Sequence, residues 1–536
     1  MPGIKEGVLL KSFLIWLLLE IPVLSAAQNS VSFNEIQDFL SNHIPIDNQN
    51  WEISQSPVSG YVYLANSAGL VEYNGITSRT FYMPFRQGVR SVNVNSSGTI
   101  YTGSFEDFGY WEKNPEGGLD FHSLATGADV PKNDEIWNIF ERDSTLFFQS
   151  FTSIYRYDTS GVTRIPGPSN MLFMFPAGER YIVQGIGVGL FWFNGEAFEF
   201  IPGSEGFSYV KVHAVIYRGN GECWICTANE GIHVFDGKTF KLQDSEISSY
   251  LREHTCNAGL IVNDSLLDFG TILKGIVFSD ETGNILKSYD YSNGLNNNTV
   301  LALYIDHSGG LWIGLDDGVN FIDVSSPVTL YANTSGDLGT IYSAIRNGDQ
   351  LYLGTNHGLF TADIVRRRGG YDFLNLKIIP NTQGQVWTLG RFRDQILCGH
   401  NDGTFLLDGN IFRRISDVTG GWSVRQYNDL LLEGTYTGII SFAINPEGKW
   451  SFRNRIIGYI EPSRSIEVDY LGYIWATHPQ KGIYRLELNE KADSVINTLY
   501  FSSTGDTSAR VSISKINNQV IFMTCGNIFC FDYENK

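Results

Sequence analysis

A short sequence unit returns twelve times along this 536-residue chain. Its clearest copy, Leu311–Phe321, is an apolar strand, a short polar turn, a glycine and a second apolar strand. Each copy is anchored on the residue before the second strand, and successive anchors lie 35 to 45 residues apart. The anchors are Gly69, Gly109, Ser153, Gly189, Gly231, Gly275, Gly318, Gly358, Gly403, Gly438, Gly482 and Asn527. Gly, and Asn as its substitute, suit turns with a positive φ. Such a period predicts a repeat architecture.

Two more strands complete each unit. A strand such as Val300–Ile305 precedes the motif, and a strand such as Lys238–Leu242 follows it. Several copies turn between the last two strands at a hairpin-forming pair: Asn74-Gly75, Asn194-Gly195, Asp236-Gly237 and Asp408-Gly409. Four short antiparallel strands in about 42 residues form a β-propeller blade. No stretch keeps a 3.6-residue period, and the best helical candidate is Val31–Leu40.

The anchors divide the chain into two propellers. The first seven anchors predict a seven-bladed propeller within residues 28–325, and Ser325-Ser326-Pro327 interrupts the pattern. The other five anchors predict a second, incomplete propeller within residues 326–536. The expected fold class is therefore all-β, with tandem β-propellers built from four-stranded antiparallel blades. Five blades of a larger ring leave apolar blade faces exposed, so the second propeller is expected to be truncated and less stable.

Residues 1–27 have the character of a signal peptide. Lys5 and Lys11 precede an apolar run that begins at Phe13, and Ser25-Ala26-Ala27 supplies small residues for cleavage. The mature chain is therefore expected to be exported and periplasmic. A net charge of −19 argues against binding of nucleic acid or anionic lipid.

The motifs of common enzymes and metal sites are absent from the sequence. The nine His show no metal-ligand spacing, and there is no phosphate-binding loop or nucleophile elbow. We therefore predict no catalytic residue, no metal and no cofactor. Cys223 and Cys226 are spaced like a redox pair, but the repeat places them on a strand, which favours buried structural thiols. Trp224, Trp312 and Trp475 occupy equivalent places and are interpreted as packing between blades.

Two insertions into the repeat are candidate binding loops. They are Phe105–Phe108 and Ser245–Asn257, the latter with Arg252 and His254. Propellers usually bind ligands where such loops gather at the ends of the central channel. Each segment is equally compatible with an ordinary loop, so the ligand-binding residues stay unknown from sequence.

The segment Asn293–Leu303, continued through Asp306 and Gly310 to Leu311–Gly314, resembles the regulator-propeller repeat of Bacteroidetes sensor proteins. Segments 48–53, 69–75 and 103–110 resemble the branch with a LuxR-type helix-turn-helix output. The resemblance implies two periplasmic propellers, followed by a three-tyrosine domain, a transmembrane helix and a cytoplasmic output. Only the propeller part is present in this chain, so the downstream domains are expected to be missing.

Three hypotheses for the function follow. By family analogy, the chain is the periplasmic ligand-sensing region of a transmembrane regulator and responds to a glycan or related nutrient. The alternatives are a secreted propeller glycosidase or lyase, which needs two suitably spaced carboxylates, and a stand-alone soluble binding propeller. In a full-length relative the region is anchored in the inner membrane. The sequence leaves the oligomeric state open, a homodimer included.

Overall fold

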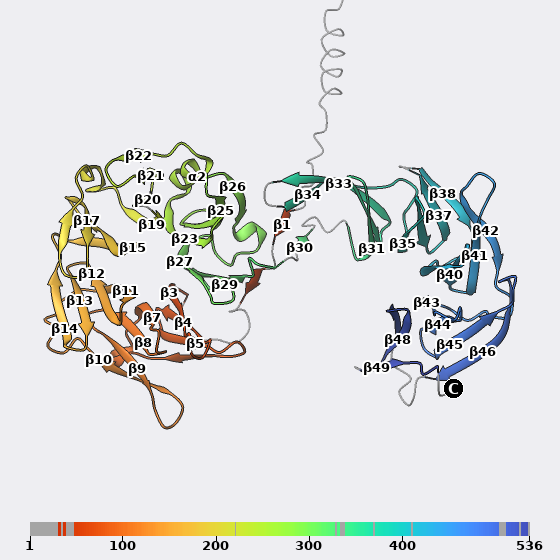
Figure 1. The fold of residues 1–536 in the computed structure, drawn as a ribbon, viewed down its shortest axis with the longest axis horizontal. Coiled ribbons are helices and arrows are strands. Elements are labelled where there is room, and N and C mark those ends of the chain that lie inside the picture. The colour runs from red at the N-terminus through yellow and green to blue at the C-terminus, as the bar shows by residue number, and fades with distance from the viewer. Residues whose placement is uncertain are drawn as a thin grey trace, which may run out of the picture. The chain divides into compact units, whose positions relative to one another are not determined.

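The computed structural model describes residues 31–33, 36–38, 48–219, 221–326, 330–332, 338–367, 370–408, 411–502, 511–524 and 527–533. The expected signal peptide lies outside these residues. The described part confirms the all-β class, since almost every element in it is a strand. The chain forms two compact units, one of residues 33–330 and one that contains residues 331–536 (Figure 1).

The first unit contains seven four-stranded antiparallel sheets, consistent with the seven expected blades. The sheets are β3 (Asn50–Gln55), β4 (Val62–Asn66), β5 (Gly69–Tyr73) and β6 (Ser78–Phe81); β7 (Val89–Val94), β8 (Ile100–Ser104), β9 (Phe108–Lys113) and β10 (Leu119–Ser123); β11 (Ile136–Arg142), β12 (Thr145–Ser150), β13 (Ser153–Asp158) and β14 (Gly161–Pro166); β15 (Met171–Ala177), β16 (Arg180–Gly185), β17 (Gly189–Phe193) and β18 (Phe198–Phe200); β19 (Val212–Gly219), β20 (Glu222–Thr227), β21 (Ile232–Phe235) and β22 (Phe240–Leu242); β23 (Cys256–Asn263), β24 (Leu266–Thr271), β25 (Ile276–Asp280) and β26 (Ile285–Tyr289); and β27 (Val300–Ile305), β28 (Leu311–Leu315) and β29 (Val319–Ile322) with β2 (Ile36–Asp38). Short 3-10 turns lie at η1 (Pro84–Arg86), η2 (Glu205–Phe207) and η3 (Tyr291–Asn293).

The seventh sheet closes the ring because its strands come from both ends of the unit. Strand β2 pairs antiparallel with β29, with Ile36 opposite Ile322. The innermost strand of the seventh sheet, β27, then lies beside β3 of the first. Polar contacts cross the same seam: Gln49 Nε2 donates to Asp316 Oδ1 at 2.8 Å, and Asn50 Nδ2 donates to Gly318 O at 3.0 Å. Strand β1 (Val31–Phe33) pairs with β30 (Leu330–Ala332) in a separate two-stranded sheet.

The second unit contains four four-stranded sheets and a three-stranded sheet within the described residues. They are β31 (Ile341–Asn347), β32 (Gln350–Thr355), β33 (Leu359–Arg367) and β34 (Gly370–Ile378); β35 (Val386–Phe392), β36 (Gln395–His400), β37 (Gly403–Asp408) and β38 (Ile411–Ser416); β39 (Ser423–Tyr427), β40 (Leu430–Thr435), β41 (Gly438–Ile444) and β42 (Trp450–Arg455); β43 (Ser465–Val468), β44 (Ile474–His478), β45 (Gly482–Leu488) and β46 (Val495–Ser502); and β47 (Ser512–Ile516), β48 (Gln519–Thr524) and β49 (Asn527–Cys530).

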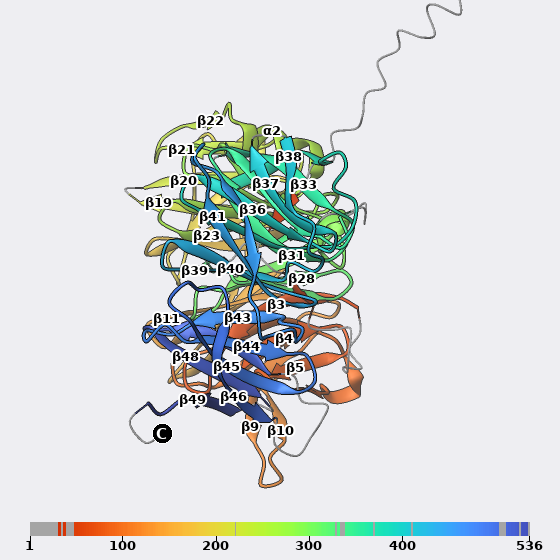
Figure 2. The same ribbon diagram turned by 90° about the vertical axis from the view of Figure 1, so that its right-hand side faces the viewer.

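These five sheets follow one another in chain order along an arc. Figure 2 looks at this unit from its outer side and shows the succession from β33 to β49. Within the described residues the arc stays open between the sheet of β48 and that of β31 (Figure 1). The sheets at both ends expose apolar side chains, among them Ile341, Ile528 and Phe529. The open arc is consistent with the incomplete ring expected from the sequence, and its lower stability stays a prediction.

The anchor glycines are needed for close packing as well as for backbone conformation. Gly69 has a φ of 153°, and a Cβ there would collide with the carbonyl of Phe81 on the fourth strand of its blade. Gly109 has no positive φ, yet a Cβ there would collide with the carbonyl of His122. The close approach of the fourth strand therefore explains the repeated glycine better than the turn alone.

The helical candidate Val31–Leu40 is wrong, because its described parts are β1 and β2. A helix forms instead at α2 (Glu246–His254), inside an insertion expected to be a loop. Its first turn is capped by Ser245, whose hydroxyl accepts from Ser248 N at 3.2 Å. Ile247 and Leu251 of α2 are fully buried against β20, β23 and β24. The helix therefore covers the core at this blade.

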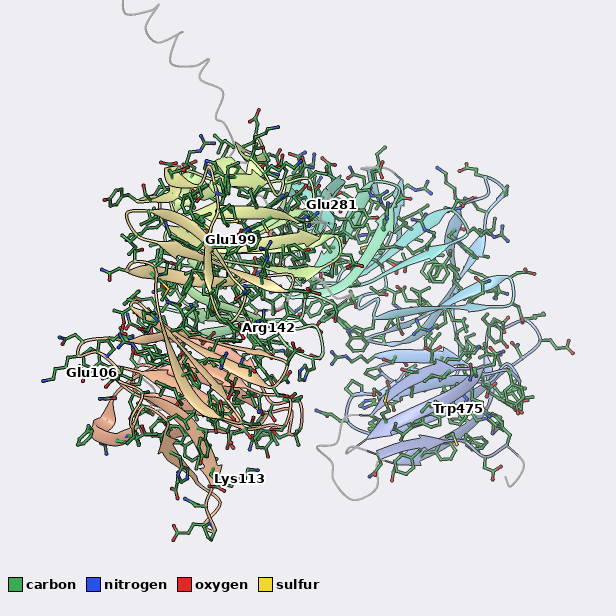
Figure 3. All side chains as sticks on the ribbon, turned by 60° about the vertical axis from the view of Figure 1, so that its left-hand side comes forward. Glu106, Lys113, Arg142, Glu199, Glu281 and Trp475 are labelled. Atoms are coloured by element: carbon green, nitrogen blue, oxygen red, sulfur yellow. The ribbon has the colours of Figure 1, made fainter. Side chains whose placement is uncertain are left out.

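The repeated tryptophans pack between blades, as expected: Trp224, Trp312 and Trp475 are at most 5% exposed. Two of them are also held by an aspartate in the preceding turn, since Trp312 Nε1 donates to Asp306 Oδ2 and Trp475 Nε1 donates to Asp469 Oδ2, both at 2.9 Å. Figure 3 places Trp475 among the last strands of its unit.

Cys223 and Cys226 are buried on β20, which confirms the structural interpretation. Burial raises the pKa of the Cys223 thiol to about 11, so it is not a ready nucleophile at neutral pH.

Ring closure by β2 can be tested with Ile36→Asp. Ile36 packs against the core shared by the sixth and seventh blades, so a carboxylate there opposes docking of the closing strand. We expect the first unit to lose about 3 kcal/mol of unfolding free energy. Calorimetric melting of the full chain measures the loss, and Gln37→Ala is the matched control because Gln37 is exposed on the same strand. Equal melting of both variants would show that β2 does not hold the ring.

Candidate ligand-binding channel

A β-bulge recurs in the innermost strand of every blade of the first unit. In β3 the register jumps between Asn50 and Glu52, and the same jump follows the first residue of the other six innermost strands. A bulge leaves its extra residue outside the ladder and re-aims its side chain. The bulge residues are Trp51, Arg90, Trp137, the pair Leu172-Phe173, His213, Asn257 and Leu301.

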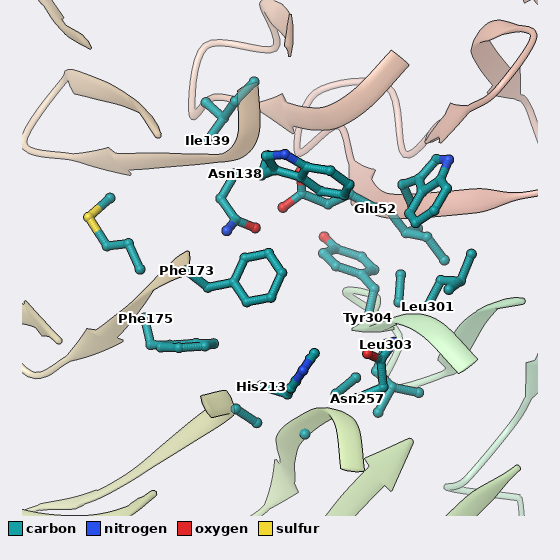
Figure 4. Close-up of a pocket in the computed structure, with 18 of the residues that line it drawn as sticks. Glu52, Asn138, Ile139, Phe173, Phe175, His213, Asn257, Leu301, Leu303 and Tyr304 are labelled. Atoms are coloured by element: carbon teal, nitrogen blue, oxygen red, sulfur yellow. The ribbon is translucent and has the colours of Figure 1, made fainter. Parts of the chain in front are cut away.

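The bulge residues surround a cavity at the centre of the ring. Its volume is about 530 Å³, and every blade contributes a bulge residue to its lining. Small-molecule sites in proteins typically enclose roughly 300–1,000 Å³. Figure 4 shows Phe173, His213 and Tyr304 around the same space, reached from three different blades. We call this cavity the channel.

One side of the channel is a continuous series of aromatic rings. Trp51 meets Trp137 edge-to-face with centroids 5.7 Å apart, and Trp137 meets Phe173 at 6.3 Å. Phe173 in turn lies 5.6 Å from the His213 ring. These four side chains come from different blades, so the ring closure described above is what brings them together.

Arg90 lies within this aromatic series. Its guanidinium is 4.3 Å from the Trp51 ring centroid and 5.5 Å from that of Trp137, both cation–π distances. Arg90 Nε also donates to Glu135 Oε1 at 2.7 Å, which compensates its charge. The result is a rigid, nearly neutral wall with a guanidinium edge.

Two titratable groups of the channel are uncharged at neutral pH. Burial raises the pKa of Glu52 to about 8, although Val92 N donates to its carboxylate at 2.9 Å and partly opposes the shift. Burial, with Lys211 nearby, lowers the pKa of His213 to about 4. The channel therefore offers a protonated carboxyl and a neutral imidazole, which bond to hydroxyls without adding charge.

Several polar atoms of these side chains have no protein partner. Among the described residues, Arg90 Nη1, Asn93 Oδ1 and Trp137 Nε1 are buried without a hydrogen-bond partner. Buried polar atoms in native proteins are nearly always satisfied, by protein, water or ligand. These three atoms, unlike others such as the carboxylate oxygens of Asp268, belong to side chains that line the channel, where a bound molecule can reach them.

Of the two candidate loops of the sequence, only the last residue of the second contributes to this site. In the first, Phe105 bridges to Glu135 and Glu106 N donates to Asp134 O, so the loop joins two neighbouring blades. The second is largely α2. Arg252 is exposed and His254 packs on Tyr250, and neither lines the channel, whereas Asn257 at the end of the segment does.

The bulge residues were missed because a strand read by itself gives no sign of a register jump. A signal was nevertheless present. Trp51, Trp137 and His213 each follow a buried residue at the start of an innermost strand, where the repeat shows no preferred side chain. Variation at an otherwise regular position of a repeat is what a recognition surface produces.

Residues 294–317 match the model of the two component regulator propeller family. The chain carries a two component regulator propeller repeat. This finding confirms the resemblance drawn from the sequence, on the stretch that leads from η3 into β28. The assignment to the branch with a LuxR-type output stays a prediction.

Solved structures resemble this chain over nearly its whole length. An extracellular domain assigned to a hybrid two component system of B. thetaiotaomicron is 16% identical, with a TM-score of 0.58, over 94% of this chain and 78% of that one. Another, assigned to a one component system of the same bacterium, is 14% identical with a TM-score of 0.44 over the same shares. At these identities the first likeness supports the propeller fold alone. No curated protein sequence matches the chain.

In the part of the chain that the structure describes, no group of three or more His, Cys, Asp or Glu side chains is arranged to hold a metal ion. No helix within the same residues is long and apolar enough to cross a bilayer.

The protonation of Glu52 has a measurable consequence. The folded state keeps the carboxyl proton up to about pH 8, whereas the unfolded chain releases it near its ordinary pKa of 4.5. The folded state therefore binds more protons in this window, and its stability falls as pH rises through it. We expect Glu52→Gln to remove this part of the pH dependence. Urea unfolding of wild type and variant from pH 5 to pH 8 measures the difference, which must widen with pH in favour of the variant; parallel curves would contradict the assignment.

Proposed function

We propose that the first propeller is the ligand-sensing region of an exported signalling protein and that its channel binds an uncharged oligosaccharide or related nutrient. The observation that carries the proposal is the set of bulge residues, which directs a different side chain from each blade into one cavity. If these side chains only filled the centre of the propeller, similar apolar residues at each bulge would be sufficient.

The chemistry of the channel favours a neutral polyhydroxy ligand. The rings of Trp51, Trp137 and Phe173 offer flat apolar faces, on which the C–H faces of sugars pack. Glu52, Asn138 and Asn257 add hydrogen-bonding groups without net charge. The chain has a net charge of −19, which opposes an anionic ligand.

The role in signalling is proposed from the regulator-propeller repeat. Proteins of that kind place such propellers outside the membrane and pass a change of shape or packing to a downstream output domain. We propose the same topology here, with export by the segment 1–27 and, in a full-length protein, an inner-membrane anchor. The two extracellular domains named above are of this type, which supports the proposal.

A secreted propeller enzyme is the alternative from another class. It requires two carboxylates placed on either side of a scissile bond. Glu52, with its raised pKa, would suit the general acid of such a pair, but it is the only carboxyl among the described residues that line the channel. We therefore favour binding without turnover. Incubation with maltohexaose, cellohexaose and xylohexaose, followed by chromatography of the products, separates the alternatives, because shortened sugars would establish an enzyme.

Trp137→Ala tests the binding site directly. Trp137 contacts both Trp51 and Phe173 and forms the centre of the aromatic wall. Removal of a central aromatic anchor typically costs about 2 kcal/mol or more of binding free energy, roughly thirtyfold in affinity. Calorimetric titration of the full chain with the same three hexasaccharides measures the loss.

The matched control is Tyr209→Ala, which removes an aromatic ring that is 81% exposed and does not line the channel. The control should bind as the wild type does. Equal affinity of the Trp137→Ala variant for a sugar that binds the wild type would place the binding site elsewhere.

A further inference from the structure

The innermost strands of the second unit place aromatic side chains where the bulge residues stand in the first. Tyr342 is the bulge residue of β31, between Ile341 and Ser343 in register, and Trp387 is that of β35. Trp422 directly precedes β39, and its N–H donates to the carbonyl of Gly434, the residue that Ser423 opposes. Three consecutive blades thus present Tyr, Trp and Trp at one equivalent position.

These side chains form a continuous cluster with Tyr436, which lies in the turn between β40 and β41. Tyr342 stacks on Trp387 with ring centroids 4.8 Å apart, and Trp387 lies 6.5 Å from Trp422. Trp422 meets Tyr436 edge-to-face at 4.6 Å. We call Tyr342, Trp387, Trp422 and Tyr436 the second aromatic platform.

The second aromatic platform is held rigidly. Trp387 Nε1 donates to the Tyr436 hydroxyl at 3.1 Å, which links the second blade of the unit to the third. The Tyr436 ring also lies directly against the backbone of Gly420, where a Cβ would collide with it. Rings fixed in this way lose little conformational entropy when a ligand binds.

Packing between blades does not account for these rings. In the same unit, packing between blades is provided by Trp475, which lies on the second strand of its blade and is 1% exposed. The platform lies instead on and next to the innermost strands, with Tyr436 in a turn beside them; Tyr342 is 41% exposed and the other three rings are half-buried. Apolar ring surface is therefore left open to solvent.

We propose that the second aromatic platform is a second binding site for a neutral oligosaccharide. Successive flat rings match the apolar faces of successive pyranose units, and the tyrosine hydroxyls add polar contacts at the edge. Arg464 stands at the corresponding position before β43 and is exposed, as Arg90 stands among the aromatic rings of the first unit. The site shares the ligand class of the proposed function but none of its residues.

The experiment is a calorimetric titration of the full chain with maltohexaose, cellohexaose and xylohexaose. Wild type is compared with Trp387→Ala, Tyr342→Ala and Trp137→Ala. Tyr371→Ala is the control, because Tyr371 is a 42% exposed tyrosine on the outer strand β34 of the same unit. Tyr342 is itself largely exposed, so its variant keeps the test valid even where Trp387→Ala unfolds the unit.

We expect wild type and Tyr371→Ala to bind a hexasaccharide at two sites. Trp387→Ala and Tyr342→Ala should each weaken one site by about tenfold or more and leave the other unchanged. Trp137→Ala should weaken binding at the channel and leave binding at the second aromatic platform unchanged. A single site that only Trp137→Ala removes would overturn this proposal and leave the first intact. Binding lost only in the platform variants would overturn the proposed role of the channel instead, and no binding of any of the three sugars would overturn both.

Discussion

The pairing of β2 with β29 is the interaction on which the rest of the first unit depends. It joins residues more than 280 positions apart in the chain, as Ile36 lies opposite Ile322. An unclosed row of blades would end in two apolar faces, and its innermost strands would not enclose a space. Gln49 and Asn50 add hydrogen bonds across the same seam. The first and seventh blades are therefore held together by hydrogen bonds as well as by apolar packing. The channel exists because this ring is shut.

Electrostatics inside the ring follow from its geometry. A narrow space enclosed by seven strands desolvates whatever points into it, so a charge there is tolerated only with a partner. Burial raises the pKa of Glu52 and lowers that of His213, so both side chains are neutral. The charge of Arg90 is balanced by its ion pair with Glu135. The interior is thus close to neutral although the chain as a whole is strongly acidic. This contrast is the reason why an uncharged ligand is proposed for the channel.

The repeat could be predicted from the sequence because each blade carries its own local signals. Strand alternation, hairpin pairs and a glycine that must admit a neighbouring carbonyl recur without reference to distant residues. Features that depend on a partner strand could not be predicted. Val31–Leu40 has a helical pattern on its own, yet becomes strand because β29 and β30 supply its partners. The bulge at Trp51 is likewise defined only against β4, which explains why the residues that line the channel could not be chosen from the sequence, whereas the repeat could.

At most positions of a blade, the side chain must suit both the strand pairing and the packing against neighbouring blades. The bulge releases its residue from the strand pairing. A residue such as Ile53 is constrained by its pairing with Leu64 on β4 and by its packing against the seventh blade, so few replacements are compatible with the fold. The bulge residue is exempt from the ladder and points into open space, and the ring already accommodates Trp, Arg, His, Asn and Leu there. Single substitutions at these positions therefore change the lining of the channel and leave the hydrogen-bonded ladder of each blade intact. Under the proposed function, the ligand preference of such a propeller can change without a loss of folding stability.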